Sequence, residues 1–290
     1  MLDLVTYLPS CNLKELCEVK NVTAAIRSLA GGTATLFAIA AKREGFKDVS
    51  LIGKMGSDRK DKTKLDSAGQ TILNELMRAG VLVNIAIDAH ISTGLTMITY
   101  LSDGKRLLVS DPGANDSFSS KDITEEMELK VEQSDILFVS GYALLSATSA
   151  SAVVRLIDRA KQNGRLVVVD IVPHSIFRII DGARFQDMTE QADLVISEIG
   201  TANRLFHHPQ TGLSSVSETA SRLLEHYGAV ILQLDGGGHF MIDKLGIIEE
   251  CSTGGQKLLP DQTRGYADQI VARLLHRHFD RLITASSVGS

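Results

Sequence analysis

The sequence contains no tryptophan, only three cysteines and no long apolar run. Cys11, Cys17 and Cys251 form neither an even-numbered framework nor a CxxC pair, which excludes a disulfide scaffold and indicates reduced thiols in a cytoplasm. No apolar stretch approaches the ~20 residues that a membrane-spanning helix needs. The first residues, MLDLVTYLPS, lack the basic start and apolar core of a signal peptide. The sequence therefore predicts a cytoplasmic protein without a membrane partner.

An excess of positive charge is also absent. The net charge is −5 and the isoelectric point is about 5.9, so we do not expect a surface for nucleic acid or for anionic lipid. The eight histidines are scattered, and the close pairs His207-His208 and His276-x-His278 lack further Cys or His partners at zinc spacing. Solvated surface histidines are the simpler interpretation of both pairs.

Short β-like runs alternate with longer helical ones along most of the chain. Val-, Ile- and Leu-rich runs separated by helices predict a parallel sheet with helices on both faces, and hence an α/β fold. The predicted strands cover 48–56, 135–142, 165–173, 192–197 and 229–238, and the predicted helices cover 71–81, 148–164 and 217–228.

One region departs from this alternation. Residues 92–116 contain two β-like runs joined by Ser102-Asp103-Gly104-Lys105, and Asp-Gly at that point is a strong hairpin signal. Residues 2–22 are also strand-like, without a clear crossover helix after them. We expect a single domain over residues 1–290, with a β-sheet lid formed by about 4–22 and 92–111. Apolar side chains on both faces of 95–101 suit a covered sheet, and packing on the main domain explains them equally well.

Glycines stand where predicted strands end and helices begin. Gly31-Gly32 opens one helix, and Gly265 opens the last helix, with Asp268 in its first turn. Free amides and the dipole at a helix N-terminus favour an anion. A carboxylate beside such a site can accept the proton of an attacking hydroxyl while the amides stabilise a transferring phosphoryl group. Taken singly, each of these motifs is more typical of a turn or a cap, as are Asp58 and the run Gly236–Gly238; their order is more informative.

That order resembles the ribokinase (PfkB) family of sugar and nucleoside kinases over nearly the whole chain. The resemblance rests on MLDLVTYLP, GGTATLFAIAAKREGFKDVSLIGKMGSD, TGLTMITYLSDGKRLLVSDPGAND and DQTRGYADQIVARLL, together with the later strands in sequence order. It implies a three-layer α/β/α fold with a mostly parallel central sheet and a small β-sheet lid. It also implies ATP and Mg²⁺ as cofactors and a homodimer formed through the lid.

The resemblance assigns roles to individual residues. Asp268 corresponds to the catalytic base, and Gly265, Tyr266 and Ala267 to the amides of the anion hole. The positions that match substrate contacts are Asp3, Gly31 and Gly32. The positions that match the nucleotide site are Gln233, Asp235, Gly238 and Glu198. The metal ligands are not identified by the sequence.

Several positions depart from the family pattern. Leu36 stands where the family has an Asn that binds sugar, and Thr201 lacks the carboxylate of the family's N-x-x-E motif, which here begins with Glu198. Asp235 would repel ATP phosphates unless a cation intervened, and Tyr266 replaces a small residue. Both ends are also shorter than the family pattern, which has a central strand before the position of Asp3 and further helices after the last motif.

Two hypotheses follow. In the first, the protein transfers the γ-phosphoryl group of ATP to a hydroxyl of a small sugar-like or nucleoside-like substrate that the sequence does not identify. In the second, it is a catalytically degenerate member of the family that acts in binding or interaction. An oxidoreductase on a dinucleotide-binding fold is a weaker alternative, because no G-x-G-x-x-G follows the first strand with an acidic residue about 20 positions on.

Overall fold

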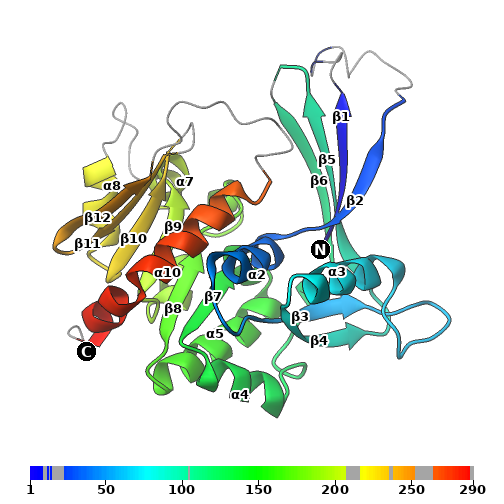
Figure 1. Cartoon of the computed structure of the whole chain (residues 1–290), viewed down its shortest axis with the longest axis horizontal. Coiled ribbons are helices and arrows are strands. Elements are labelled where there is room, and N and C mark those ends of the chain that lie inside the picture. Colours follow the sequence, from blue (N-terminus) through cyan, green and yellow to red (C-terminus); the bar gives the residue numbers. More distant parts are fainter. Residues whose placement is uncertain are drawn as a thin grey trace. The chain divides into compact units, whose positions relative to one another are not determined.

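The computed structural model describes residues 1–8, 12, 14, 23–103, 105–206, 216–234, 238–251 and 264–287, and it divides into two compact units (Figure 1). The first unit comprises Met1–Phe118 and Leu258–Tyr266, and the second comprises Ser119–Lys257 and Ala267–Ser290. Within the ranges just given, no helix is both long and apolar enough to span a bilayer.

A four-stranded sheet forms one part of the first unit, in the order β2-β1-β5-β6. β1 pairs in parallel with β5, while β1–β2 and β5–β6 are antiparallel. The strands are β1 (Leu2–Leu8), β2 (Ile26–Ala30), β5 (Thr93–Leu101) and β6 (Arg106–Gly113). The antiparallel β5–β6 pair confirms the hairpin predicted at 102–105, although Gly104 itself lies outside the described residues. Strand β2 was not predicted, because most of its side chains are exposed and it shows no apolar alternation.

The rest of the first unit contains a parallel pair of strands connected through a helix. Its elements are α2 (Thr33–Glu44), β3 (Ser50–Gly56), α3 (Ser67–Arg78), β4 (Leu82–Asp88) and the 3₁₀ turn η1 (Ala114–Ser117). Helix α3 begins at Asp66, whose carboxylate accepts a hydrogen bond from the Gly69 amide at 2.8 Å. Ile72 and Leu76 of α3 are fully buried and pack in a core with residues of β1, β2 and β3.

A six-stranded sheet forms the centre of the second unit, in the order β12-β11-β10-β9-β8-β7. β7 to β10 are parallel, and β11 and β12 are antiparallel. The strands are β7 (Ile136–Ser140), β8 (Leu166–Asp170), β9 (Leu194–Glu198), β10 (Ala229–Gln233), β11 (His239–Asp243) and β12 (Gly246–Cys251). Val167, Val168 and Val169 of β8 have no exposed surface, as expected for a strand covered on both faces.

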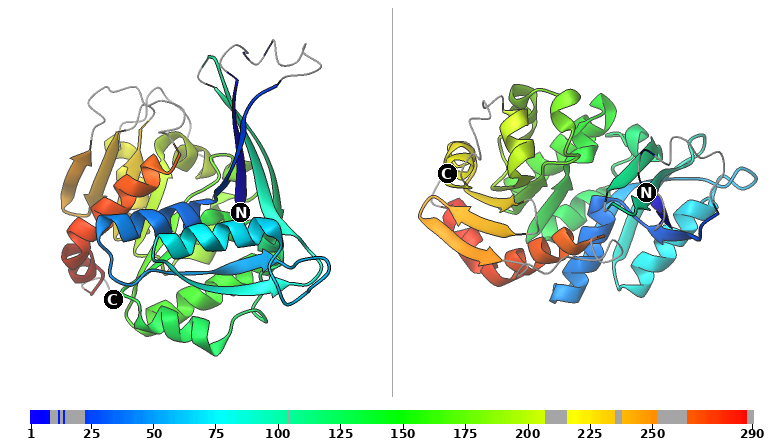
Figure 2. Two further views of the ribbon diagram at one scale, coloured as in Figure 1. Left: turned by 45° about the vertical axis from the view of Figure 1, so that its right-hand side comes forward. Right: turned by 90° about the horizontal axis from the view of Figure 1, so that it is seen from above.

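Helices cover both faces of this sheet. Figure 2 shows α10 along one face, and α5 and α8 on the opposite face. The helical elements are α4 (Glu125–Gln133), η2 (Gly141–Leu144), α5 (Ala147–Gln162), η3 (Ile176–Arg178), α6 (Gly182–Thr189), α7 (Ile199–Leu205), α8 (Val216–Leu223) and α10 (Tyr266–Ser287). The predicted α/β class, with a mostly parallel sheet and an additional small sheet, is confirmed.

The largest errors in the predicted boundaries are at the ends of two elements. The helix predicted over 217–228 ends at Leu223. The strand predicted over 229–238 ends at Gln233, and the chain returns as β11, with the Leu234 amide donating to the Gly238 carbonyl at 2.8 Å. Strands β10 and β11 are antiparallel neighbours, so the chain reverses after Gln233 where the sequence predicted one continuous strand.

Candidate active site

In the first unit, Asp3 and Arg264 form an ion pair. The Arg264 Nε donates to the Asp3 Oδ2 at 3.1 Å, and the Arg264 Nη2 donates to the carbonyl oxygen of Ala30. Burial raises the pKa of the Asp3 carboxyl above its ordinary value, and the nearby Arg264 charge and hydrogen bond oppose that shift. The predicted substrate-binding carboxylate is thus held by an arginine from the segment just before the last helix.

Gly31 provides the space in which the Asp3 carboxylate lies. A Cβ atom on Gly31 would be 1.9 Å from the Asp3 Oδ1, far inside contact distance. Gly32 follows as the N-cap of α2, with a φ of 87°, in the region that favours glycine. The structure therefore brings Asp3 and Gly31, two of the three predicted substrate residues, into contact. The third, Gly32, is the next residue after Gly31.

The turn that leads into α10 is left-handed. Gly265 has a φ of 73°, and a Cβ atom there would lie 3.9 Å from the Leu36 Cδ2 of α2. Helix α10 begins at the next residue, Tyr266. An apolar side chain therefore faces the predicted anion-binding turn, at the position where the family pattern has an Asn.

In the second unit, the charges of Asp268 and Glu198 act on the carboxyl of Asp170, and we call these three residues the acidic cluster. Asp268 lies in the first turn of α10, as predicted. Asp170 is the last residue of β8 and is buried; burial, and then the charges of Asp268 and Glu198, raise its pKa well above the ordinary value. Sequence reasoning missed Asp170, although a carboxylate directly after a fully apolar strand was a usable signal.

Glu198 and the neighbouring nucleotide candidates lie at the carboxyl ends of β9 and β10. Glu198 precedes α7 as its N-cap residue, and its Oε2 lies 3.1 Å from the His174 Nδ1. Gln233 is the register partner of Glu198 on the adjacent strand. Gly238 closes the hairpin after β10, and Asp235 lies outside the described residues. Gln233 and Glu198, predicted from motifs 35 positions apart in the sequence, are therefore neighbours.

Thr201 does not restore the missing carboxylate. Its side chain is buried in α7, and its hydroxyl lies 3.5 Å from the His174 carbonyl oxygen. Throughout the described ranges, no group of three or more His, Cys, Asp and Glu side chains is arranged to hold a metal ion. The carboxylates of Asp170 and Glu198 are nevertheless the type of oxygen ligand that Mg²⁺ takes, and Mg²⁺ sites commonly use one or two carboxylates together with substrate phosphates.

Solved structures with the same fold include adenosine kinases and a fructokinase. An adenosine kinase from Sinorhizobium meliloti is 16% identical with a TM-score of 0.73, over 99% of this chain and 85% of that one. An Anopheles gambiae adenosine kinase in complex with P1,P4-di(adenosine-5) tetraphosphate is 15% identical, with a TM-score of 0.75. The match covers 99% of this chain and 90% of that chain. A Xylella fastidiosa fructokinase with bound ATP is 17% identical, with a TM-score of 0.72. The match covers 96% of this chain and 78% of that chain.

The sequence itself matches the profile of the pfkB family carbohydrate kinases over residues 3–249. The fold is thus ribokinase-like, and the chain belongs to the pfkB family of carbohydrate kinases. Kinases of this family are ATP-dependent phosphotransferases that act on alcohol groups. A search of curated proteins found no match to this chain. The roles given above to single residues remain predictions.

Proposed function

We propose that this protein transfers the γ-phosphoryl group of ATP to a hydroxyl of a small sugar-like or nucleoside-like molecule, with Asp268 as the base. The observation that carries the proposal is the position of Asp268 in the first turn of α10, three residues after the left-handed Gly265. Asp268 accepts the proton of the attacking hydroxyl. The amides of Gly265, Tyr266 and Ala267 stabilise the charge of the transferring group.

The acidic cluster is suited to a cation-dependent reaction. Burial, followed by the charges of Asp268 and Glu198, raises the pKa of Asp170, and a bound cation would relieve both effects. Asp170 and Glu198 would hold Mg²⁺, which neutralises phosphate charge when it is bound. We assign Gln233, Gly238 and Asp235 to nucleotide binding; of these, Gln233 is the register partner of Glu198. The negative charge of Asp235 makes the cation a requirement at this site.

We assign Asp3, Gly31 and Gly32 to the substrate. Asp3 presents a carboxylate that Arg264 already holds in one orientation, and an oriented carboxylate suits recognition of a hydroxyl. The adenosine kinases and the fructokinase with the same fold support nucleosides and sugars as the first molecules to examine.

We also propose that the four-stranded sheet pairs with the same sheet of a second copy. Four apolar side chains on one face of it are between 38% and 68% exposed: Ile26, Met97, Leu107 and Val109. In the sheet register, Met97 is the partner of Val109. A second row across the sheet runs from Ile26 through Thr6 and Thr99 to Leu107. Exposed apolar side chains from three strands on one face of a sheet are typical of an interface.

The direct test is turnover of Mg-ATP with a panel of sugars and nucleosides that includes adenosine and fructose. Asp268→Asn should lower kcat by at least ~10²-fold, the contribution expected of a general base. Asp280→Asn is the matched control, since Asp280 is exposed on the same helix. Unchanged turnover in Asp268→Asn would remove Asp268 from the role of base.

A second function, that of a degenerate family member which binds without catalysis, is favoured by three observations. Leu36 faces the turn at Gly265. Thr201, which stands where the family has a Glu, is buried and has no carboxylate. The Asp3 carboxylate already accepts a hydrogen bond from Arg264. Under this alternative, Mg-ATP causes no rise in the melting temperature. A clear rise with millimolar Mg-ATP, as mass action requires of a nucleotide-binding protein, would decide against it.

A further inference from the structure

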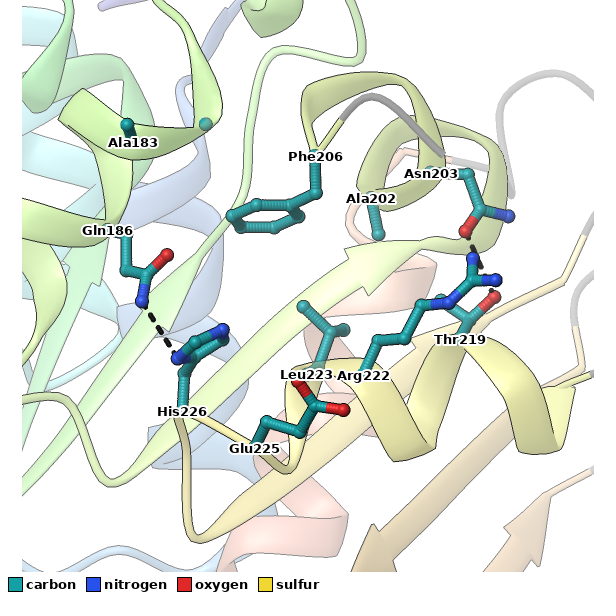
Figure 3. A pocket seen from close by; sticks show the side chains of 11 residues that line it. Ala183, Gln186, Ala202, Asn203, Phe206, Thr219, Arg222, Leu223, Glu225 and His226 are labelled. Carbon is teal, nitrogen blue, oxygen red and sulfur yellow. Dashed lines mark hydrogen bonds between the residues drawn. The ribbon is translucent and has the colours of Figure 1, made fainter. Parts of the chain in front are cut away.

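The second unit contains a pocket among α6, α7 and α8, but several of its polar groups already bond to one another. The Gln186 Nε2 and the His226 Nδ1 lie 2.8 Å apart, and the Thr219 hydroxyl donates to the Asn203 Oδ1 at 3.3 Å (Figure 3). None of the residues assigned above to substrate or nucleotide lines this pocket. A charged side chain with closer links to the proposed reaction is Arg264 of the first unit.

Arg264 joins three segments of the first unit. Its Nε donates to the Asp3 Oδ2 on β1 at 3.1 Å, and its Nη2 donates to the carbonyl oxygen of Ala30 at the end of β2. The next residue, Gly265, forms the left-handed turn that leads into α10. The guanidinium therefore connects the turn of the proposed anion hole to the two strands at which the proposed substrate residues lie.

Apolar burial contributes little to holding this turn. None of the residues from 264 to 269 is buried, and the first buried residue of α10 is Ile270. A segment without buried apolar side chains opens locally at a low cost in free energy. The Arg264 side chain is itself largely withdrawn from solvent, with 19% of it exposed. Its two hydrogen bonds are therefore tertiary contacts that hold the turn in place.

The geometry of these two bonds is suited to an arginine. The two acceptors are contacted by different nitrogen atoms of one rigid planar group, which fixes the direction of the Arg264 side chain. A lysine carries all its donors on a single nitrogen, so it would keep the charge beside Asp3 without reproducing both contacts. Gly31 leaves the space in which the Asp3 carboxylate lies, and so it fixes the position of one acceptor.

We propose that Arg264 is a positioning residue for phosphoryl transfer, because it holds the turn that presents the anion-hole amides and Asp268 to the reacting group. This inference rests on the proposed kinase function. Asp3 then acts on the reaction through Arg264, in addition to its proposed contact with the substrate. A displacement of catalytic groups by about 1 Å costs about 10²-fold in rate, so the effect of Arg264 should appear in kcat.

The kinetic test is Arg264→Lys, which keeps a cation beside Asp3. With Mg-ATP and an accepted substrate, kcat should fall by about 10- to 100-fold, and the KM values for both substrates should change by less than about threefold. Arg273→Lys is the matched control, since Arg273 is exposed on α10, and it should leave kcat and KM unchanged. An unchanged kcat in Arg264→Lys, or a change confined to KM, would overturn the inference.

Cleavage by trypsin tests the hold on the turn without any turnover of substrate. Trypsin requires an arginine or lysine side chain that is free to enter its specificity pocket. The parent should therefore resist cleavage after Arg264 and be cleaved after Arg59, which is exposed in the connection between β3 and α3. Arg264→Lys should be cleaved after position 264 about tenfold faster than the parent, because a hydrogen bond is lost. Fragment masses identify each cleavage.

The two measurements separate this inference from the function on which it rests. A parent that phosphorylates no sugar or nucleoside contradicts the proposed function, and the trypsin rates then decide whether Arg264 holds the turn. Equal cleavage rates after position 264 in the parent and in Arg264→Lys would overturn that hold. So would cleavage of the parent after Arg264 as fast as after Arg59, a comparison that stands even if circular dichroism shows Arg264→Lys to be unfolded.

Discussion

Arg264 donates a hydrogen bond to Asp3 although 261 positions separate the two residues in the sequence. Both side chains are largely withdrawn from solvent, with 19% of the Arg264 side chain and 6% of the Asp3 side chain exposed. The pair connects strand β1 to the segment that precedes α10. It joins the segment MLDLVTYLP, which contains Asp3, to the segment DQTRGYADQIVARLL, which contains Arg264. The proposed substrate-binding carboxylate is therefore also part of the stability of the first unit.

The first prediction concerns the energy of this pair. Arg264→Gln leaves the Asp3 carboxylate buried without a cation, so the free energy of unfolding should fall by about 3–5 kcal/mol. Adding Asp3→Asn in the same chain should recover part of that loss, because the unpaired charge is gone. Urea unfolding of the two single variants and the double variant measures the coupling. Strictly additive losses would show that the two side chains do not interact in solution.

The second prediction concerns Gly31. A methyl group there would occupy the position of the Asp3 carboxylate, so Gly31→Ala should displace Asp3 and lower the melting temperature. Gly53→Ala is the matched control, because a Cβ atom on Gly53 meets nothing within 4 Å. Differential scanning calorimetry of both variants is the measurement. If the two substitutions had equal effects, the close approach of Gly31 to Asp3 would not exist in the folded protein.

The third prediction concerns Asp170 and pH. Its folded-state pKa is raised by burial and by its acidic neighbours, so the folded protein holds this proton over a range in which the unfolded chain releases it. Stability should therefore fall as the pH rises from about 4, the ordinary value for Asp, toward the raised pKa of Asp170. Asp170→Asn removes this penalty and should be more stable than the parent at pH 8, with a smaller difference at pH 4.

Urea unfolding at both pH values measures this effect. Asp187→Asn is the control, because Asp187 is an exposed aspartate of the same unit. The prediction would be contradicted if Asp170→Asn were less stable than the parent at pH 8 and if the stability difference between the two proteins were the same at pH 4.

The fourth prediction concerns the apolar face of the four-stranded sheet. If two copies pair through it, Val109→Lys should convert the dimer to a monomer, because a buried lysine without a partner is strongly unfavourable at an interface. Leu245→Lys tests the same change at a side chain of the second unit that is 90% exposed, and it should leave the mass unchanged. Light scattering coupled to size-exclusion chromatography gives the mass of each. A monomeric parent protein would exclude the pairing.

Much of the fold was accessible from local pattern. The continuous apolar runs predicted β7, β8, β9 and β10 of the second unit, since a strand buried on both faces requires apolar side chains throughout. Gly31-Gly32 and Gly265 correctly marked the starts of α2 and α10. Strand β2 and the hairpin after Gln233 were not predicted, because exposed strands and chain reversals are specified by partners elsewhere in the chain.

The candidate site divides in the same way. The sequence by itself determined that Asp268 stands in the first turn of a helix after a glycine, because caps and first turns depend only on neighbouring residues. Only the tertiary structure decided that Arg264 pairs with Asp3 and that Asp170 shares its surroundings with Asp268. Hydrogen bonds act over about 3 Å and charge effects depend on burial, so these relations arise only when distant segments pack together.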